Sequence, residues 1–458
     1  MKNLCLPFLF CFLTISLQAQ WISQNTNFTN PHNCMMVDMV DANVAWASGW
    51  TGDFATMGGW SIDVDDHTFS RTTDGQNWQQ GTFDPDGNGL ITGLSAVDAN
   101  TAFIAYNEYG SNNPVQVLKT TDGGLTWDSL HVGMTIWINF VHAFDAEHIV
   151  AMGDPDNEGW QVFITADGGI SWERINPFLL PDDPGEFGPV NTYSVDGDQI
   201  WFSTSNGRVF HSEDKGQNWE FNGTPVQSGP TYPDCIACRD GGTCIESFTK
   251  YTNNADTTSY HRAYLYRTNN NGSTWDSLDL GNNQFCVAGM QYIPGSDGVL
   301  IASFRHNNFE GPFYTRISYD DGDNWITVDS SARVYHFDFA DPDHGYATEY
   351  ENDGMPTEIY RFDGSPLLGL FKPGSLDMEC SLFPNPATDH VVLEMKVGEL
   401  DNFWILLHDA KGNLLQKLSF TGVNGIRESM DISGLSAGLY TLTVSNSRGS
   451  FTRKLVKQ

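Results

Sequence analysis

The stretch Thr120-Thr-Asp-Gly-Gly-Leu-Thr-Trp127 is one of six copies of a short motif that recurs along this chain. Four copies read S/T-x-D-x-G-x-x-W, one has Asn270 in place of Asp, and the copy at 72–78 is one residue short. Successive copies end in tryptophans that lie 45 to 56 residues apart. A period of this length is typical of one supersecondary unit repeated around an axis, and four short strands fill it. The repeat therefore predicts an all-β protein built from propeller blades. The copies cover residues 72–78, 120–127, 165–172, 212–219, 268–275 and 318–325.

The repeated residues of the motif suit a structural role. A Ser or Thr hydroxyl and an Asp carboxylate can cap the backbone N–H groups of a tight hairpin, and the Trp can bury its ring between neighbouring sheets. A catalytic residue is normally needed once, so six copies argue against catalysis. The residues concerned are Asp74, Asp122, Asp167, Asp214, Asn270, Asp320, Trp78, Trp127, Trp172, Trp219, Trp275 and Trp325.

The last unit of the repeat lacks the motif and one strand. Residues 334–339, 345–350 and 358–362 supply three strands, and we expect Trp21-Ile-Ser-Gln24 to supply the fourth. This pairing closes the ring and hides sheet edges that would otherwise promote aggregation. Residues 21–364 are thus predicted to form one seven-bladed β-propeller.

On these motifs the chain resembles the Asp-box, or BNR, repeat proteins: sialidases, sortilin-type receptors, xyloglucanases and photosystem-assembly-factor-like propellers. The resemblance covers about three quarters of the chain. It implies the propeller fold, with the motifs on the outer rim and away from the usual binding face. It does not select an activity.

The C-terminal part has a different composition. Residues 365–378 are expected to be a linker, and residues 379–458 a small β-sandwich of short strands separated by turn residues. The strands are expected at 391–395, 403–408, 414–420, 426–432, 438–444 and 451–456.

Several motifs in this sandwich fall in a recognisable order. They contain Pro384, Asn385, Pro386, Gly438, Tyr440 and Lys454. With them the segment resembles the type A C-terminal sorting domain of the type IX secretion system. The resemblance implies the type IX machinery as a partner and transport across the outer membrane of a Gram-negative bacterium, so that the protein is secreted or held at the cell surface.

The N-terminal residues and the net charge limit where the protein can be located and which partners it can bind. Residues 1–20 combine Lys2, an apolar run and a small residue, Ala19, near a cleavage point, as in an export signal peptide. No later apolar run is long enough for a transmembrane segment. The net charge of -34 disfavours nucleic acid as a partner, because phosphate backbones would be repelled.

Six cysteines remain once the signal peptide is removed, and export permits disulfides. Cys238 and Cys244 flank a predicted turn and can bridge a hairpin. A zinc site that uses Cys235-x-x-Cys238 is a weaker alternative, because no histidine pair follows at metal-binding spacing. Pairing stays open among Cys34, Cys235, Cys238, Cys244, Cys286 and Cys380.

Long, dissimilar loops join the second and third strands of most repeats, and loops on a rigid scaffold often carry function. They bring aromatic and polar side chains to one face, which suits binding of an extracellular glycan or protein. The candidate binding residues are Trp50, Trp60, Tyr109, Trp160, Arg305 and His306. Asp154 and Glu349 on the same face are candidates for a catalytic carboxylate pair.

We therefore favour a non-catalytic binding module, with a glycoside hydrolase as the alternative. A sialidase is disfavoured because the Arg-Ile-Pro signature is absent and arginine is scarce. The xyloglucanase arrangement, in which acidic residues face each other between two propellers, is not met by a chain with one propeller.

One string resembles a calcium loop. Asp84-Pro-Asp86-Gly-Asn88-Gly matches the first six positions of D-x-D-x-N-G, but Ser95 stands where the twelfth position needs Glu. Calcium held by Asp84, Asp86 and Asn88 is the only cofactor that the sequence suggests, and an ordinary blade-connecting turn is the alternative.

Overall fold

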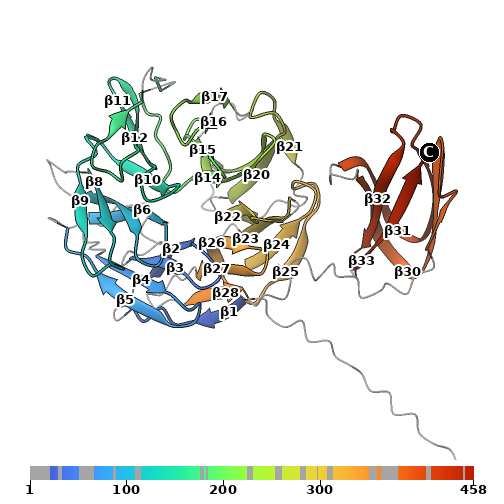
Figure 1. Cartoon of the computed structure of the whole chain (residues 1–458), viewed down its shortest axis with the longest axis horizontal. Coiled ribbons are helices and arrows are strands. Elements are labelled where there is room, and N and C mark those ends of the chain that lie inside the picture. The colour runs from blue at the N-terminus through green and yellow to red at the C-terminus, as the bar shows by residue number, and fades with distance from the viewer. Residues whose placement is uncertain are drawn as a thin grey trace, which may run out of the picture.

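The computed structural model of the chain (Figure 1) describes residues 21–28, 33–50, 67–85, 89–108, 115–175, 180–181, 184–223, 231–252, 260–278, 285–296, 298–306, 313–349, 358–362, 380–408, 414–446 and 449–458. Within these ranges the regular structure consists of strands. No helix capable of crossing a membrane occurs in these ranges.

Seven four-stranded antiparallel sheets form the first part of the described chain, and Figure 1 looks down the ring that they make. The first three sheets are β2 (Asn33–Met39), β3 (Ala45–Trp50), β4 (Thr68–Thr72) and β5 (Trp78–Thr82); β6 (Gly89–Ala96), β7 (Ala102–Glu108), β8 (Val115–Thr120) and β9 (Asp128–Leu130); and β10 (Ile138–Ala143), β11 (Ile149–Asp156), β12 (Gly159–Thr165) and β13 (Glu173–Arg174).

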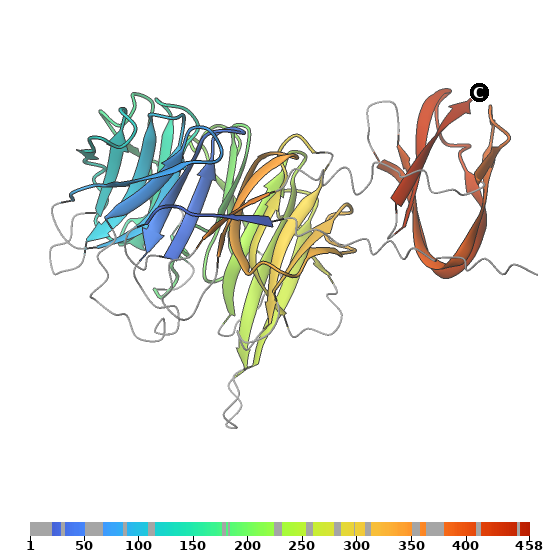
Figure 2. The same ribbon diagram turned by 90° about the horizontal axis from the view of Figure 1, so that it is seen from below.

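The next three sheets are β14 (Tyr193–Asp196), β15 (Gln199–Ser203), β16 (Arg208–Ser212) and β17 (Glu220–Gly223); β18 (Thr231–Arg239), β19 (Thr243–Thr252), β20 (Tyr260–Thr268) and β21 (Asp276–Leu278); and β22 (Phe285–Tyr292), β23 (Leu300–His306), β24 (Phe313–Ser318) and β25 (Ile326–Asp329). The sheet that contains β18 to β20 has the longest strands of the ring, and Figure 2 shows these yellow-green strands reaching further than their neighbours along the ring axis.

The seventh sheet closes the ring. It contains β26 (Val334–Asp341), β27 (His344–Glu349) and β28 (Ile359–Phe362), and its fourth strand is β1 (Trp21–Gln24) from the opposite end of the chain. Trp21 pairs with Phe362, and Ser23 pairs with Tyr360. The predicted closure by the N-terminal strand is thus confirmed, and the all-β propeller fold with it.

Apolar side chains fill the space between neighbouring sheets, and the motif tryptophans belong to this packing. The ring of Trp127 lies 5.4 Å from that of Phe69, and the ring of Trp325 lies 5.1 Å from that of Phe304. Trp21 contributes in the same way to the last junction, because its ring packs edge-on against Phe362 at 5.5 Å. These large rings thus add apolar burial at the blade junctions, beside the aliphatic side chains of the same cores.

Each motif caps its own hairpin. In the copy at 120–127, Thr126 N donates to Asp122 Oδ1 at 2.9 Å and Gly124 N donates to Thr120 Oγ1 at 2.8 Å. The hydroxyl of Thr126, which donates to Asp122 Oδ2 at 2.6 Å, and the backbone N–H of Thr126 lower the pKa of Asp122, because they favour the ionised carboxylate. Asn270 makes the equivalent contacts, since its Oδ1 accepts from Thr274 N at 2.9 Å. The carboxylate is therefore replaceable by an amide within this fold.

The C-terminal part forms one five-stranded sheet from β29 (Cys380–Phe383), β30 (His390–His408), β31 (Leu414–Asp431), β32 (Gly438–Asn446) and β33 (Gly449–Lys457). Four of the predicted strands are in fact two long ones, because β30 and β31 continue through a register shift between Lys396 and Asp401. Both halves of β30 contribute side chains to a single core, as Val391 and Ile405 illustrate. This shared core is what a β-sandwich requires.

The predicted sorting motif holds the last strand of this sheet. Asn385 Nδ2 donates to Lys454 O at 2.6 Å, and Val456 N donates to Asn385 Oδ1 at 2.9 Å. Ala387 N also donates to Val456 O at 2.8 Å. One asparagine side chain thus serves both a donor and an acceptor on the edge of β33, which a shorter or apolar side chain cannot do.

Candidate functional site

The predicted binding residues are only partly within the described structure. Trp60 and Tyr109 lie outside the described residues. Trp50 and His306 end strands β3 and β23, but their side chains are not among those described. Arg305 precedes His306 on β23 and is partly buried. These five residues stay predictions.

The prediction that Trp160 is a binding residue is wrong. Its side chain is fully buried, and its ring lies 5.9 Å from that of Phe202 and 5.7 Å from that of Phe210. The residue lies on β12, and its ring fills the junction with the sheet that contains β15 and β16. It cannot offer a stacking surface to a ligand.

The two candidate catalytic carboxylates lie in different environments. Burial raises the pKa of Asp154, although its Oδ1 accepts hydrogen bonds from Asn139 Nδ2 at 2.9 Å and Gly188 N at 3.0 Å. Burial likewise raises the pKa of Glu349, whose Oε1 accepts from Tyr360 OH at 2.8 Å.

The structure does not bring these two carboxylates together. Asp154 is on β11 and Glu349 is on β27, and the sheets β2–β5 and β6–β9 stand between their sheets in the ring. Each carboxylate has its own local partners. A glycosidase needs two carboxyl groups within roughly 5–10 Å, so these positions do not form such a pair.

One end of the ring carries the loops between second and third strands and the connections between sheets, and we call it the loop-rich end. A buried ion pair that the sequence did not suggest fixes part of this end. The connection between β13 and β14 carries Glu186, which accepts from Arg208 Nε at 2.9 Å and from Arg208 Nη2 at 2.6 Å. The same guanidinium donates to Leu180 O at 3.1 Å, and Thr204 donates to Glu186. Both charged side chains are buried. Fork-to-fork geometry of this kind is strong and directional, so the pair fixes Glu186 against β16.

Exposed apolar side chains lie on this connection and on the connection between β9 and β10. Ile136, Leu180 and Phe187 are exposed to 41%, 63% and 37%. Asp154 joins the neighbours of two of them, because Asp154 N donates to Trp137 O at 2.9 Å and Asp154 Oδ1 accepts from Gly188 N at 3.0 Å. We call Ile136, Leu180 and Phe187 the apolar platform. It lies at the end of the ring where sheets connect to one another, opposite the motif hairpins.

A cavity of about 280 Å³ runs along the centre of the ring. Residues from the inner strands of all seven sheets line it, together with Asn191, which precedes β14. The polar side chains in this lining are those of Asp38, His142, Asn191, Tyr193, Ser194, Gln291, Tyr292, His336 and Asp338. The inner strands β2, β6, β10, β14, β18, β22 and β26 are sheet edges, so their unpaired N–H groups need partners.

Side chains of neighbouring sheets supply many of these partners. At one register position, a polar side chain accepts a hydrogen bond from the N–H of the next inner strand. Five junctions show it: Ala96 N to Asp38 Oδ2 (2.6 Å), Ala143 N to Ser95 Oγ (3.0 Å), Cys238 N to Ser194 Oγ (2.9 Å), Phe339 N to Gln291 Oε1 (3.0 Å) and Met39 N to Asp338 Oδ2 (2.7 Å). We call these contacts the inner latches.

Two of the latch residues are adjacent carboxyl groups. Asp38 on β2 and Asp338 on β26 lie within hydrogen-bonding reach of each other, and Gln291 Nε2 also donates to Asp338 Oδ1 at 2.7 Å. Burial raises the pKa of both groups, and the Asp338 charge raises that of Asp38 further. We assign the shared proton to Asp38, because the hydrogen bond between the two groups raises the pKa of Asp38 and lowers that of Asp338. An Asp inside an otherwise apolar inner strand, as in residues 36–39 and 337–339, was the sequence signal for this pair.

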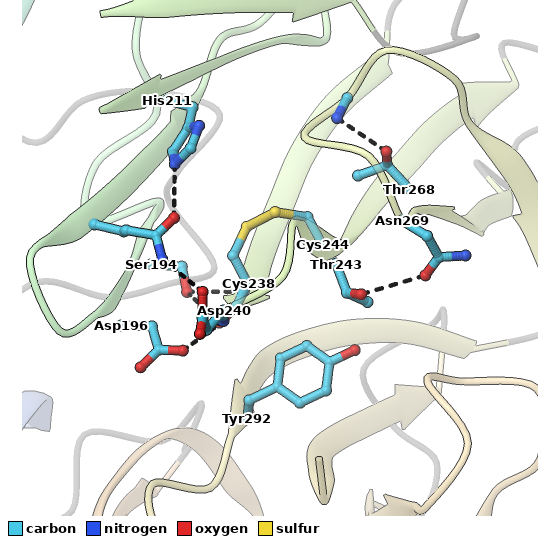
Figure 3. Close-up of a disulfide and its surroundings, with 12 residues drawn as sticks. Ser194, Asp196, His211, Cys238, Asp240, Thr243, Cys244, Thr268, Asn269 and Tyr292 are labelled. Atoms are coloured by element: carbon cyan, nitrogen blue, oxygen red, sulfur yellow. Dashed lines mark hydrogen bonds between the residues drawn. A yellow bond between two sulfur atoms is a disulfide. The ribbon is translucent and has the colours of Figure 1, made fainter. Parts of the chain in front are cut away.

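A disulfide joins Cys238 on β18 to Cys244 on β19 beside the cavity, as one sequence interpretation expected (Figure 3). Cys235 is a buried free thiol. Because Cys238 is oxidised, the Cys235-x-x-Cys238 zinc alternative is not supported. Figure 3 also shows Ser194 beside Cys238, where its hydroxyl forms the latch of this junction.

The calcium string is not tested by the structure. Asp86 and Asn88 lie outside the described residues, and Asp84 alone is exposed at the end of the described segment. Within the described part of the chain, no three His, Cys, Asp or Glu side chains are grouped closely enough to hold a metal ion.

Two segments of the chain match known families. Residues 381–458 match the secretion system C-terminal sorting domain, and residues 109–229 match the photosynthesis system II assembly factor YCF48 family. The chain thus joins a BNR-type propeller to a type IX sorting domain, which targets it for secretion to the outer surface. No curated protein sequence matches the chain.

Solved structures with the same fold come from proteins of different activities. A structure described as YCF48 bound to D1 peptide is 15% identical, with a TM-score of 0.51, over 76% of this chain and 99% of that one. YCF48 from Cyanidioschyzon merolae is 16% identical, with a TM-score of 0.52, over 75% and 99%. The GH74 xyloglucanase from Xanthomonas campestris is 14% identical, with a TM-score of 0.51, over 83% of this chain but 60% of the enzyme. At these identities the similarity establishes the propeller fold alone.

Proposed function

We propose that this protein is an exported, non-catalytic binding protein that recognises a polypeptide through the loop-rich end of its ring. The observation that carries the proposal is the apolar platform. Three exposed apolar side chains stand on connections that a buried ion pair and backbone hydrogen bonds hold in place. Protein-binding surfaces combine exposed apolar anchors with a rigid polar surround.

The similar structures support the same choice. The propeller matches nearly the whole length of the YCF48 chains, one of which is bound to a peptide, and only part of the GH74 enzyme. The platform residues also fall within the segment 109–229 that matches the YCF48 family. A glycan ligand and a glycoside hydrolase are the competing functions, and the separation of Asp154 from Glu349 weakens the second.

The test is a selection experiment on the mature full chain. A random peptide library and a glycan array are screened against the native protein and against the triple variant Ile136→Asp, Leu180→Asp, Phe187→Asp. The matched control is Leu125→Asp with Ile170→Asp, because these side chains are 84% and 88% exposed but lie on motif hairpins at the other end of the ring.

We expect peptides selected by the native chain to bind at least tenfold more weakly to the triple variant and equally well to the control. A glycan that binds both proteins equally, with no peptide selected, would contradict the polypeptide proposal. Release of shortened sugars from a bound glycan would contradict the non-catalytic one.

A further inference from the structure

We propose that Asp154, beside the apolar platform, binds the positively charged end of a lysine or arginine side chain of the polypeptide that the platform recognises. The inference rests on the function proposed above and adds the chemistry of its ligand, which is a basic residue next to apolar ones.

Hydrogen bonds tie Asp154 to both connections that carry platform residues. Asp154 N donates at 2.9 Å to the carbonyl of Trp137, which follows Ile136. Asp154 Oδ1 accepts at 3.0 Å from the N–H of Gly188, which follows Phe187. Asp154 thus bridges two chain segments that each present an exposed apolar side chain.

Two acceptor oxygens at this point lack a donor. The Asp154 side chain is partly buried, and the hydrogen bonds from Asn139 Nδ2 and Gly188 N both end on Oδ1, so that Oδ2 accepts none within the described chain. Asn139 is fully buried, and its own Oδ1 has no hydrogen-bond partner among the described residues. Because this oxygen belongs to the amide that binds Asp154, the two unfilled acceptors are on adjacent groups. A buried acceptor without a donor is costly, so an incoming N–H group would be favoured here.

The positive charges on the neighbouring elements are engaged by other acids. Arg174, on the same sheet as Asp154, is paired with Asp156 at 2.8 Å, and Arg208, on the next sheet, is paired with Glu186 at 2.6 Å. Burial raises the pKa of Asp154, and only the two neutral hydrogen-bond donors lower it. A cation that reaches this carboxylate therefore meets an uncompensated charge in a partly desolvated place, where attraction is stronger than in water.

A basic side chain suits this arrangement better than a metal ion. Calcium needs about six or more oxygen ligands, and the residues that the structure describes contain no group of three metal-ligating side chains. Ammonium and guanidinium groups bring several N–H donors, and their stems can lie along exposed apolar side chains such as Ile136 and Phe187. The net charge of -34 also speeds the approach of a cationic peptide.

The test uses the mature full chain and a random peptide library. Native protein and the variant Asp154→Asn are each used for selection, and the frequencies of lysine and arginine in the selected peptides are compared. Asparagine keeps an acceptor for Gly188 N and removes the charge. The control is Glu158→Gln, which removes the same charge from an 82% exposed side chain between β11 and β12. A selected basic peptide and its copy with norleucine in place of the basic residue are then measured by fluorescence anisotropy.

We expect lysine or arginine to be enriched with the native protein and with Glu158→Gln, but not with Asp154→Asn. Norleucine should weaken binding to the native protein about tenfold and binding to Asp154→Asn by about twofold or less. If peptides are selected without basic residues, or if Asp154→Asn selects them as the native chain does, the inference is overturned while the proposed function stands. If no peptide is selected, both are overturned. Should Asp154→Asn not fold, equal binding of the basic and norleucine peptides by the native chain overturns the inference.

Discussion

The ring and the C-terminal sheet both protect the edges of their strands, but they do so by different means. In the ring, β1 pairs with β28 from the far end of the chain, and the inner latches place polar and ionisable side chains on the inner edges. In the C-terminal sheet, one neutral residue, Asn385, and the backbone of Ala387 hold the edge of β33. The ring therefore uses ionisable carboxyl groups at two of its latches, whereas the contacts that hold the edge of β33 are neutral.

The ring and the C-terminal sheet also differ in the numbers of acidic and basic residues. Residues 381–458 contain eight Lys and Arg against seven Asp and Glu, whereas the first 380 residues contain 15 against 50. Asp38, Asp154, Asp234, Glu246, Asp338 and Glu349, whose pKa values burial raises, all belong to the ring. The comparison predicts that mutation of a ring contact and change of pH act mainly on the ring.

The largest effect is expected from Trp21→Ala. The buried indole packs against Phe339 and Phe362 and donates from Nε1 to Thr315 Oγ1 at 3.1 Å, so its loss opens a cavity at the closure of the ring. We expect a loss of about 3–5 kcal/mol in the free energy of unfolding, measured by urea denaturation. Ile22→Ala on the exposed side of the same strand is the control and should cost less than about 0.5 kcal/mol. Equal effects of the two substitutions would show that β1 does not close the ring.

The second effect concerns pH. Because burial raises the pKa of Asp38 above its unfolded value near 3.8, the folded ring binds a proton that the unfolded chain releases, and stability falls as pH rises from about 4 toward the folded pKa. Asp38→Asn keeps an acceptor for Ala96 N and a donor for Asp338, so its stability advantage over the native chain should grow with pH. Urea titrations at pH 4, 6 and 8 measure the difference.

The matched variant at the other carboxyl should behave differently. In Asp338→Asn the new amide N–H faces the Nε2 donor of Gln291, which leaves a buried group unsatisfied. We expect a loss of about 1–3 kcal/mol at every pH. If the two asparagine variants instead show the same stability and the same pH profile, the assignment of the proton to Asp38 is wrong.

A smaller effect is expected in the C-terminal sheet. Asn385→Ala removes two exposed hydrogen bonds to β33 and should destabilise this sheet by about 1 kcal/mol. Because no ionisable group takes part, the loss should be the same at pH 5 and pH 8. Protection of the amide of Val456 from hydrogen exchange is the readout, and unchanged protection would show that Asn385 does not hold the edge.

The smallest effect is expected at the motif hairpins. Asp167→Asn reproduces the state that Asn270 already adopts in another copy, where the amide accepts from Thr274 N in the same way. The urea midpoint should stay that of the native chain. A clear decrease would mean that the carboxylate charge, rather than the hairpin cap, is what the motif requires.

Much of the fold could be predicted because the repeat is local. The motif at 120–127 contains both the residues that cap its hairpin and its own tryptophan. The last unit lacks a fourth strand, and the segment that begins at Trp21 could be predicted to supply it. The long strands β30 and β31 were predicted as four, because a register shift between Lys396 and Asp401 looks like a turn in sequence.

The candidate site was less predictable, because it depends on which residues the ring brings together. Trp160 sits beside a loop in sequence and yet is buried between sheets. Glu186 and Arg208 are 22 residues apart and became partners only when the connection folded back. Asp38 and Asp338 meet because the ring closes, and no local pattern joins residues 300 positions apart.

The central claim, recognition of a polypeptide at the loop-rich end, is tested most directly by hydrogen–deuterium exchange of the mature chain with and without a selected peptide. The account predicts slower exchange in residues 184–191 and around Ile136 when the peptide is bound, with the motif hairpins at 122–126 and 167–171 unchanged. Slower exchange confined to those hairpins, at the opposite end of the ring, would contradict it.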